Sequence, residues 1–233
     1  MAASRREPAQ QRSRERVDQI VAAAAELLDE GGVEALTTRA LAEHSGIPVP
    51  TIYRYFADRD EIVLAFLDRE FADIGKSVAR AVLALDHVSI ATAMRATAQA
   101  HLCYHEQHPI AVEVWFGGTQ TAAIHAYIRA YDHEIARQWT ENSAAVGFMS
   151  PEMPPFLFDL VARLFNRIWE YCFLEHDEAA DRAEIAALGV SEAIKIVEQY
   201  ATPRGRDGIS GAEYAQAMAE LYGFKLPLRG VSQ

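Results

Sequence analysis

Apolar residues recur at three- and four-residue spacing along most of the chain, and this pattern predicts helices. A first helix is expected from about residue 13 to residue 30, where Gly31-Gly32 stops it, because glycine readily adopts the left-handed conformation that closes a helix. A short helix follows Leu36, capped by Thr37 or Thr38. After a turn at Gly46-Ile47-Pro48, a second short helix is expected from Val49 to Tyr55, with Pro50 tolerated in its first turn.

A longer helix is expected to begin after Asp58 and to continue to about Leu85. Asp58 supplies a carboxylate cap and Glu61 follows three residues later, which is the spacing of a capping box. From Val88 onward the signals are all helical, with no convincing alternating run of β-branched residues. Helices are expected at about 88–107, 110–116, 120–146, 155–176, 181–201 and 211–222.

These elements predict an all-α protein: an N-terminal three-helix DNA-binding domain with a helix-turn-helix, followed by a larger helical domain. The expected divisions are a disordered basic arm, the helix-turn-helix domain, a regulatory and dimerisation domain, and a C-terminal extension with one short helix. Their ranges are 1–12, 13–60, 61–202 and 203–233.

The distribution of charge along the chain indicates more about DNA binding than the net charge does. The chain of 233 residues has a net charge of −11, which is unusual for a DNA-binding protein. Residues 1–16 nevertheless hold five arginines against two glutamates, whereas residues 61–233 hold 14 basic against 23 acidic residues. The acidic body disfavours indiscriminate adsorption to phosphate, so DNA contact is expected at a local basic edge.

Composition excludes several other classes. No stretch reaches the roughly 18 uncharged apolar residues that a membrane span needs, and the N-terminus has no apolar run behind its arginines, so no membrane partner and a cytoplasmic location are expected. Two cysteines are too few for a disulfide framework or a thiolate zinc site. No phosphate loop, dinucleotide fingerprint, nucleophile elbow or metalloprotease helix is present, so neither a cofactor nor an enzymatic activity is expected.

The helix expected at 155–176 has a wider apolar surface than a helix needs to pack on the core of its own domain. Its polar residues fill one strip, whereas a surface helix of a monomer uses an apolar arc of about 100° or somewhat more. With the helix at 181–201 it could form an intersubunit four-helix bundle; the alternative is that it lies buried in its own domain. The candidate interface residues are Phe156, Leu160, Leu164, Ile168, Val190, Ala193, Ile194 and Val197.

The stretch from Leu36-Thr37-Thr38-Arg39 through Gly46, followed by Pro50-Thr51-Ile52-Tyr53-Arg54-Tyr55-Phe56 and Arg59, resembles the DNA-binding domain of the TetR family of bacterial transcriptional regulators. The resemblance covers roughly residues 14–62. It implies a homodimer with two reading heads and an all-helical regulatory domain containing a small-molecule pocket. The chain departs from a frequent family pattern in having Pro48 where Ser or Thr often caps the recognition helix.

By position, the resemblance assigns DNA contacts to both helices of the motif and to the start of the next helix. Arg39 could donate two hydrogen bonds to a guanine, while Thr51 and the Pro50 ring present apolar atoms to a thymine methyl group. Hydroxyl groups and Arg59 could bind phosphate, which fixes register without reading sequence. The candidate DNA-binding residues are Thr38, Arg39, Val49, Pro50, Thr51, Tyr53, Arg54, Tyr55 and Arg59.

Aromatic and histidine side chains in the larger domain are candidates for lining a pocket between helices, although most would serve equally well in a core. His101, His105 and His108 share about one quadrant of a helix. They could ligate a metal or bind an acidic effector; helix-end histidines stabilised by the helix dipole are favoured instead, so no metal site is assigned. The candidate pocket residues are His101, Tyr104, His105, Trp115, Phe116, Phe148, Phe165 and Trp169.

The sequence thus predicts a ligand-responsive DNA-binding transcriptional regulator, a repressor released from a pseudo-palindromic operator by a small-molecule effector. Its partners are double-stranded operator DNA, an effector of unknown identity, and a second copy bound through the helices at 155–176 and 181–201. The alternatives are a ligand-independent architectural DNA-binding protein and an all-helical enzyme.

Overall fold

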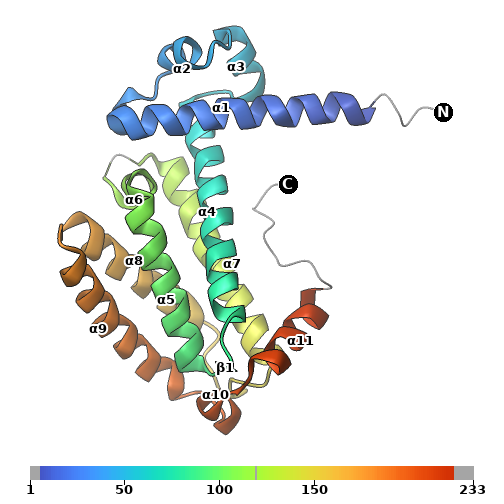
Figure 1. The fold of residues 1–233 in the computed structure, drawn as a ribbon, viewed down its shortest axis with the longest axis vertical. Coiled ribbons are helices and arrows are strands. Elements are labelled where there is room, and N and C mark those ends of the chain that lie inside the picture. Colours follow the sequence, from blue (N-terminus) through green and yellow to red (C-terminus); the bar gives the residue numbers. More distant parts are fainter. Residues whose placement is uncertain (1–5, 119, 223–233) are drawn as a thin grey trace.

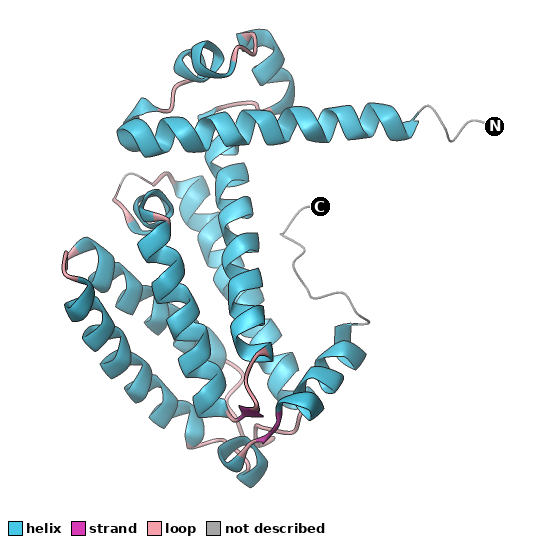
Figure 2. Ribbon diagram, in the orientation of Figure 1, coloured by secondary structure: helices cyan, strands magenta, loops and turns pink. Residues whose placement is uncertain are grey.

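The computed structural model of the chain describes residues 6–118 and 120–222, which form eleven helices and two very short strands (Figure 1). Almost every described segment is helical or a connecting loop (Figure 2). The predicted all-α class is therefore confirmed. A small group, α1 to α3, lies at one end of the molecule, and the long helix α4 runs from it into a larger helical body.

The first helix, α1 (Arg6–Ala35), lies across the end of α4 (Figure 1). Its backbone leaves helical geometry at Gly31 and Gly32, where Gly32 has a φ of 67°. The predicted helix stop is thus present, and Val33 folds back into the core. The predicted disordered arm at 1–12 differs from the structure from Arg6 onward, because the helix begins there; residues 1–5 lie outside the described residues.

The two helices of the motif are α2 (Thr38–Ser45) and α3 (Val49–Tyr55). Thr37 caps α2 by accepting a hydrogen bond from the backbone nitrogen of Ala40 at 3.1 Å, and Gly46 ends it with a φ of 67°, a conformation that glycine adopts without strain. Pro48 precedes α3 and makes no side-chain cap. The turn is therefore set by Gly46 and the fixed backbone of Pro48 and not by a capping hydroxyl group.

The connecting helix α4 (Arg59–Leu83) begins after Asp58, the predicted cap, but the Glu61 side chain bonds Ala57 and not the backbone nitrogen of Asp58 that a capping box would use. Asp58 accepts from the backbone nitrogen of Glu61 at 3.0 Å, and the Glu61 carboxylate accepts from Ala57 N at 2.6 Å. Ile62 and Phe66, in the first two turns, are almost fully buried against α1 to α3. The boundary expected at residue 60 therefore falls inside the core of the small domain, because the start of α4 completes that core.

The larger body contains five further helices close to the predicted positions. The helices α5, α7, α8 and α9 are long and pack against one another, and α8 and α9 approach closely because Gly189 has no side chain: a Cβ there would lie 2.6 Å from Ile168 Cδ1. The bounds are α5 (Ile90–Gln107), α6 (Pro109–Phe116), α7 (Ala122–Ala145), α8 (Leu157–Leu174) and α9 (Ala179–Glu198).

The C-terminal segment contains more structure than the single helix expected at 203–233. It has a short helix α10 (Pro203–Asp207) and then α11 (Gly211–Tyr222), and residues 223–233 lie outside the described residues. Between them β2 (Ile209–Ser210) pairs antiparallel with β1 (His87–Val88). This two-residue pairing fixes α11 against the far ends of α4 and α7, opposite α9 (Figure 1).

Candidate functional site

The outward face of α3 presents the side chains that the sequence assigned to DNA. Tyr53 is 53% exposed, and Pro50 and Arg54 are also exposed, while Ile52 between them is fully buried. The helix is only seven residues long, so its inner face is held by Ile52 and by Phe56 just after it, leaving the rest free. Val49, Thr51 and Tyr55 are half-buried at the edges of this face.

The two cationic side chains of this surface already have partners. Arg39 on α2 is exposed and binds Glu43 one turn later, with 2.9 Å between Nε and Oε1, while Thr38 beside it is half-buried. Arg54 lies over the ring of Tyr55, with 5.1 Å between the guanidinium carbon and the ring centroid. A phosphate or base that approaches Arg39 therefore competes with the Glu43 carboxylate for the Arg39 guanidinium group.

Arg59 points in a different direction from the one the sequence suggested. Its Nη2 donates a hydrogen bond to the carbonyl oxygen of Val33 at 2.5 Å, and its Nε is buried. The side chain therefore ties the start of α4 to the end of α1 inside the small domain. Sequence position alone suggested a surface contact, because nothing in the motif reveals that the Val33 carbonyl lies within reach.

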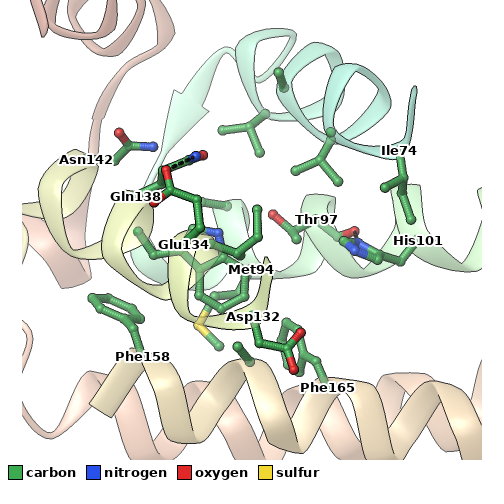
Figure 3. A pocket seen from close by; sticks show the side chains of 18 of the residues that line it. Ile74, Met94, Thr97, His101, Asp132, Glu134, Gln138, Asn142, Phe158 and Phe165 are labelled. Carbon is green, nitrogen blue, oxygen red and sulfur yellow. Dashed lines mark hydrogen bonds between the residues drawn. The ribbon is translucent and has the colours of Figure 1, made fainter. Parts of the chain in front are cut away.

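The larger body encloses a cavity of about 250 Å³ between α4, α5, α7, α8 and α11 (Figure 3). Side chains of α4 line one wall from Asp68 to Leu83, and small residues there, Gly75 and Ala79, leave room for the space. Aromatic side chains of α7 and α8 line the facing wall, and α11 closes one end with Tyr214, Met218 and Tyr222. The helix that begins directly after the small domain thus forms one side of the cavity.

Comparisons with known proteins match the small domain to a family of regulatory proteins. Residues 20–66 match the family described as bacterial regulatory proteins, tetR family. The match covers the second half of α1, the helix-turn-helix and the first two turns of α4. The transcriptional repressor KstR of Mycolicibacterium smegmatis is 39% identical over 71 residues, which are 30% of this chain and 35% of that protein. The chain therefore spans about a third of the length of the curated relatives it matches.

Solved structures share the whole fold at low identity. A TetR-family regulator from Syntrophomonas wolfei has a TM-score of 0.62 at 15% identity, covering 79% of this chain and 96% of that one. A TetR variant from Acinetobacter baumannii, solved in complex with minocycline, has a TM-score of 0.54 at 17% identity, covering 77% and 94%. These likenesses establish the fold of the larger body and no more.

Five of the eight residues predicted for a pocket line the cavity: His101, Trp115, Phe148, Phe165 and Trp169. The prediction was wrong for the other three. The Tyr104 hydroxyl group turns to α4 and donates to the Glu70 carboxylate at 3.0 Å. His105 and Phe116 pack against each other outside the cavity, with 5.7 Å between their ring centroids.

The three histidines of α5 lie in different environments. His101 Nδ1 donates to the Thr97 carbonyl at 2.9 Å, and His108 stacks on Tyr104 with 4.1 Å between ring centroids. His105 is 1% exposed, and neither ring nitrogen has a hydrogen-bond partner. Burial, followed by the nearby His101 and His108, lowers the pKa of His105 to about 3, so the ring is neutral. Among the described residues no cluster of metal-ligating side chains is found.

Sequence reasoning missed the polar side chains of the cavity, which come mainly from α7. Asp132, Gln138 and Asn142 point toward the space from this helix (Figure 3). A signal was available: Ile124, Ile128 and Ile135 mark an apolar stripe along α7, and Asp132 interrupts it. A carboxylate on the inner face of an amphipathic helix is unusual unless it has a partner or a function.

The predicted dimer residues divide into two groups. Ile168, Val190, Ala193, Ile194 and Val197 are buried in the core of the single chain, so their assignment to an interface was wrong: α8 and α9 use these side chains to pack on each other and on α5. Leu164 is half-buried, while Phe156 is 63% exposed and Leu160 49% exposed.

The exposed part of α8 and α9 includes large apolar residues that were not among the predicted interface residues. Tyr171, Leu174 and Leu188 are each about half exposed or more, and together with Phe156 and Leu160 they make five of the seven large exposed apolar side chains among the described residues. The small and branched side chains of α9 mark its inner face. Its outer face mixes polar and apolar residues, so the sequence pattern indicates an interface there only weakly. No helix of residues 6–222, residue 119 aside, is long and apolar enough to cross a membrane.

Proposed function

We propose that the chain is a dimeric transcriptional repressor that binds a pseudo-palindromic operator and releases it when a small molecule fills the cavity of the larger body. The observation that carries the proposal is the course of α4. Its first turns complete the core of the DNA-binding domain, and its later turns form a wall of the cavity. A single rigid element therefore contacts both sites.

The DNA-binding role is supported by the exposed face of α3 and by the family match over residues 20–66. Tyr53, Pro50 and Arg54 are exposed on a short helix whose inner face is held by the buried Ile52. Arg12, Arg14 and Arg16 are exposed at the N-terminal end of α1. These arginines would add sequence-independent attraction to phosphate, while α3 and Arg39 read the groove.

The cavity supports the response to a ligand. Filling it would displace α4 against α7 and α8, because a packed interior shifts between discrete arrangements and does not deform continuously. Arg59 holds the first turn of α4 to Val33, so a tilt of α4 would carry the small domain with it. The effector must bind the conformation with low DNA affinity more tightly, since only that difference can shift the equilibrium.

The dimer is proposed to form through the outer faces of α8 and α9. Leu160, Leu164, Tyr171 and Leu174 follow one another at steps of four, seven and three residues, which places them on one stripe of α8, and Leu188 of α9 is 66% exposed. A stripe of this kind is covered in a symmetric pair by the same stripe of a second copy. Two reading heads are then held at a fixed separation, as half-sites on DNA require.

The experiment that tests this function combines a ligand screen with DNA binding. A thermal-shift screen identifies compounds that raise the melting temperature, since a ligand that binds only the folded state stabilises it. The same compounds should then weaken binding to the operator in a mobility-shift assay. Specific DNA binding that no stabilising compound changes would favour the alternative, an architectural protein that responds to no ligand.

A further inference from the structure

The walls of the cavity carry acidic and aromatic side chains but no lysine or arginine among the described lining residues. The one histidine there, His101, donates its Nδ1 hydrogen to the Thr97 carbonyl oxygen, and burial lowers its pKa, which favours the neutral ring. Three carboxylates are present, Asp68, Asp132 and Glu134, and the rest of the lining is largely apolar, with aromatic rings from α4, α7, α8 and α11. A space of this composition disfavours an anionic ligand, which would face like charges without a cationic partner.

Asp132 is the buried carboxylate of the lining, and no ion pair among the described residues includes it. It is only 7% exposed, and its one hydrogen bond among the described residues is from Asn166 Nδ2 to Oδ1 at 2.8 Å. Arg163 binds Asp159 instead, with 2.9 Å between Nε and Oδ2, and His133 binds the same carboxylate. Burial raises the pKa of Asp132 and outweighs the opposing effects of Asn166, Arg163 and His133.

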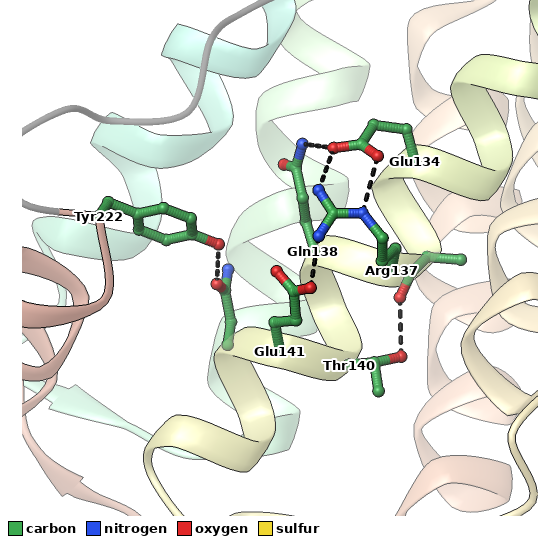
Figure 4. Close-up of polar contacts among 8 residues, drawn as sticks. Glu134, Arg137, Gln138, Thr140, Glu141 and Tyr222 are labelled. Atoms are coloured by element: carbon green, nitrogen blue, oxygen red, sulfur yellow. Dashed lines mark hydrogen bonds and ion pairs between the residues drawn. The ribbon is translucent and has the colours of Figure 1, made fainter.

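The other two carboxylates of the lining differ from Asp132. Glu134 forms an ion pair with Arg137 and accepts a hydrogen bond from Gln138, while Arg137 also binds Glu141 (Figure 4). Asp68 accepts a hydrogen bond from the Tyr127 hydroxyl group and is only half-buried. Among the described residues, Asp132 is therefore the one buried lining carboxylate that has no cationic partner.

Aromatic rings lie around the part of the cavity that contains Asp132. Phe165 and Trp169 come from α8, the helix that supplies Asn166, and Tyr131 precedes Asp132 on α7. Trp139 packs edge-on against Phe165, with 5.9 Å between ring centroids. Aromatic faces attract organic cations, and this attraction strengthens where water is excluded.

From these contacts we infer that the cavity selects lipophilic organic cations, with Asp132 as counter-ion and the surrounding aromatic rings as the walls of the cation site. The inference rests on the proposed function, in which this cavity is the effector site. A neutral apolar ligand would fill the space but leave the buried carboxylate unpaired. A ligand carrying a carboxylate would add a second buried anion beside it.

The three tryptophans of the chain provide a direct readout, because Trp115, Trp139 and Trp169 all line the cavity. Intrinsic fluorescence of the full chain would be titrated with three probes that share a phenylbutyl group: (4-phenylbutyl)trimethylammonium, 4-phenylbutan-1-ol and 4-phenylbutanoate. We expect the ammonium probe to bind at least tenfold more tightly than the alcohol, and the carboxylate to bind most weakly. Equal affinities, a preference for the carboxylate, or no binding by the ammonium probe would overturn the inference.

Two variants separate the role of Asp132 from a general effect of negative charge. Asp132→Asn keeps the shape of the side chain and should reduce ammonium affinity about tenfold or more while leaving the alcohol within about twofold. Asp181→Asn makes the same chemical change on α9, at an exposed residue that does not line the cavity, so it should change neither affinity. Circular dichroism checks that both variants are folded. An unchanged ammonium preference in Asp132→Asn would contradict the assignment.

Failure of the cation site and failure of the proposed regulatory function give different experimental results. If 4-phenylbutanoate quenches the tryptophans and releases operator DNA, the effector cavity stands and its selectivity for cations is refuted. If the ammonium probe binds in an Asp132-dependent manner but DNA affinity does not change, the cation site stands and the proposed switch fails.

Discussion

The Arg59 side chain donates a hydrogen bond to the carbonyl oxygen of Val33, and this contact joins the first turn of α4 to the last turn of α1. It makes Arg59 a structural residue of the small domain, whereas a phosphate contact was expected from its position in the motif. The two roles predict different consequences of substitution, so they can be separated by experiment.

Arg59→Ala should lower the free energy of unfolding by about 1 to 3 kcal/mol, because it leaves a part-buried carbonyl without its charged donor. Arg59→Lys keeps the charge but lacks the planar fork, so it should recover little of this loss. Denaturant unfolding measures both variants. If Arg59→Ala is as stable as the wild type but its DNA affinity depends less steeply on salt, with a slope smaller by about 1, the phosphate role is correct instead.

The pair formed by Arg39 and Glu43 predicts opposite effects of two substitutions on DNA binding. Arg39→Ala should weaken binding to the operator about tenfold or more with little effect on random DNA, since Arg39 is the candidate base reader. Glu43→Gln should strengthen binding to both, because it removes an anion from the surface and frees the Arg39 guanidinium. Fluorescence anisotropy with both duplexes tests the pair. Equal losses on specific and random DNA for Arg39→Ala would show that it does not read bases.

His105 predicts a loss of stability in mild acid. Its pKa falls to about 3 in the folded protein, below that of the unfolded chain, so its contribution to stability is present above about pH 6.5 and is lost as the pH falls toward 3. His105→Leu should therefore make the melting temperature less dependent on pH between 6.5 and 4. His125→Leu is a control, since that histidine is exposed on α7 and its ring makes no hydrogen bond among the described residues. A pH profile unchanged by His105→Leu would show that the ring is already protonated or solvated when folded.

The exposed stripe of α8 predicts the position of the dimer interface. Leu160→Glu and Leu188→Glu should each shift the protein from dimer to monomer, because they place a charge in an apolar contact. Leu221→Glu is a matched control: it changes a leucine that is 41% exposed on α11, away from α8 and α9. Sedimentation velocity over a range of concentrations measures the state. Dissociation by Leu221→Glu alone would place the interface elsewhere.

The order and limits of the helices could be predicted from local signals. Gly46 has a left-handed backbone, Thr37 and Asp58 accept cap hydrogen bonds, and Ile52 is buried at the position that the helical spacing assigns to it. These features depend on residues close together in the sequence. The same holds for the exposed face of α3, since a seven-residue helix with one buried side has little choice of orientation.

Contacts between distant segments were not accessible in this way. Arg59 reaches a carbonyl 26 residues earlier, and Tyr104 turns to Glu70 on another helix, because the packing of α1 and α5 on α4 brings these groups together. The inward faces of α8 and α9 were mistaken for an interface for a related reason: an apolar side chain indicates burial but not whether the same chain or a second copy covers it. Asp132 could have been noticed as a carboxylate within an apolar stripe.

The most direct test of the central claim is the affinity of the full chain for DNA that it selects from a random pool, measured by fluorescence anisotropy with and without a compound that stabilises the protein in a thermal-shift screen. The account predicts a pseudo-palindromic sequence, two protein chains per duplex, far weaker binding to one half-site than to two, and release of the duplex as the compound is added. Selection of no common sequence, or equal affinity for selected and random duplexes at every compound concentration, would contradict it.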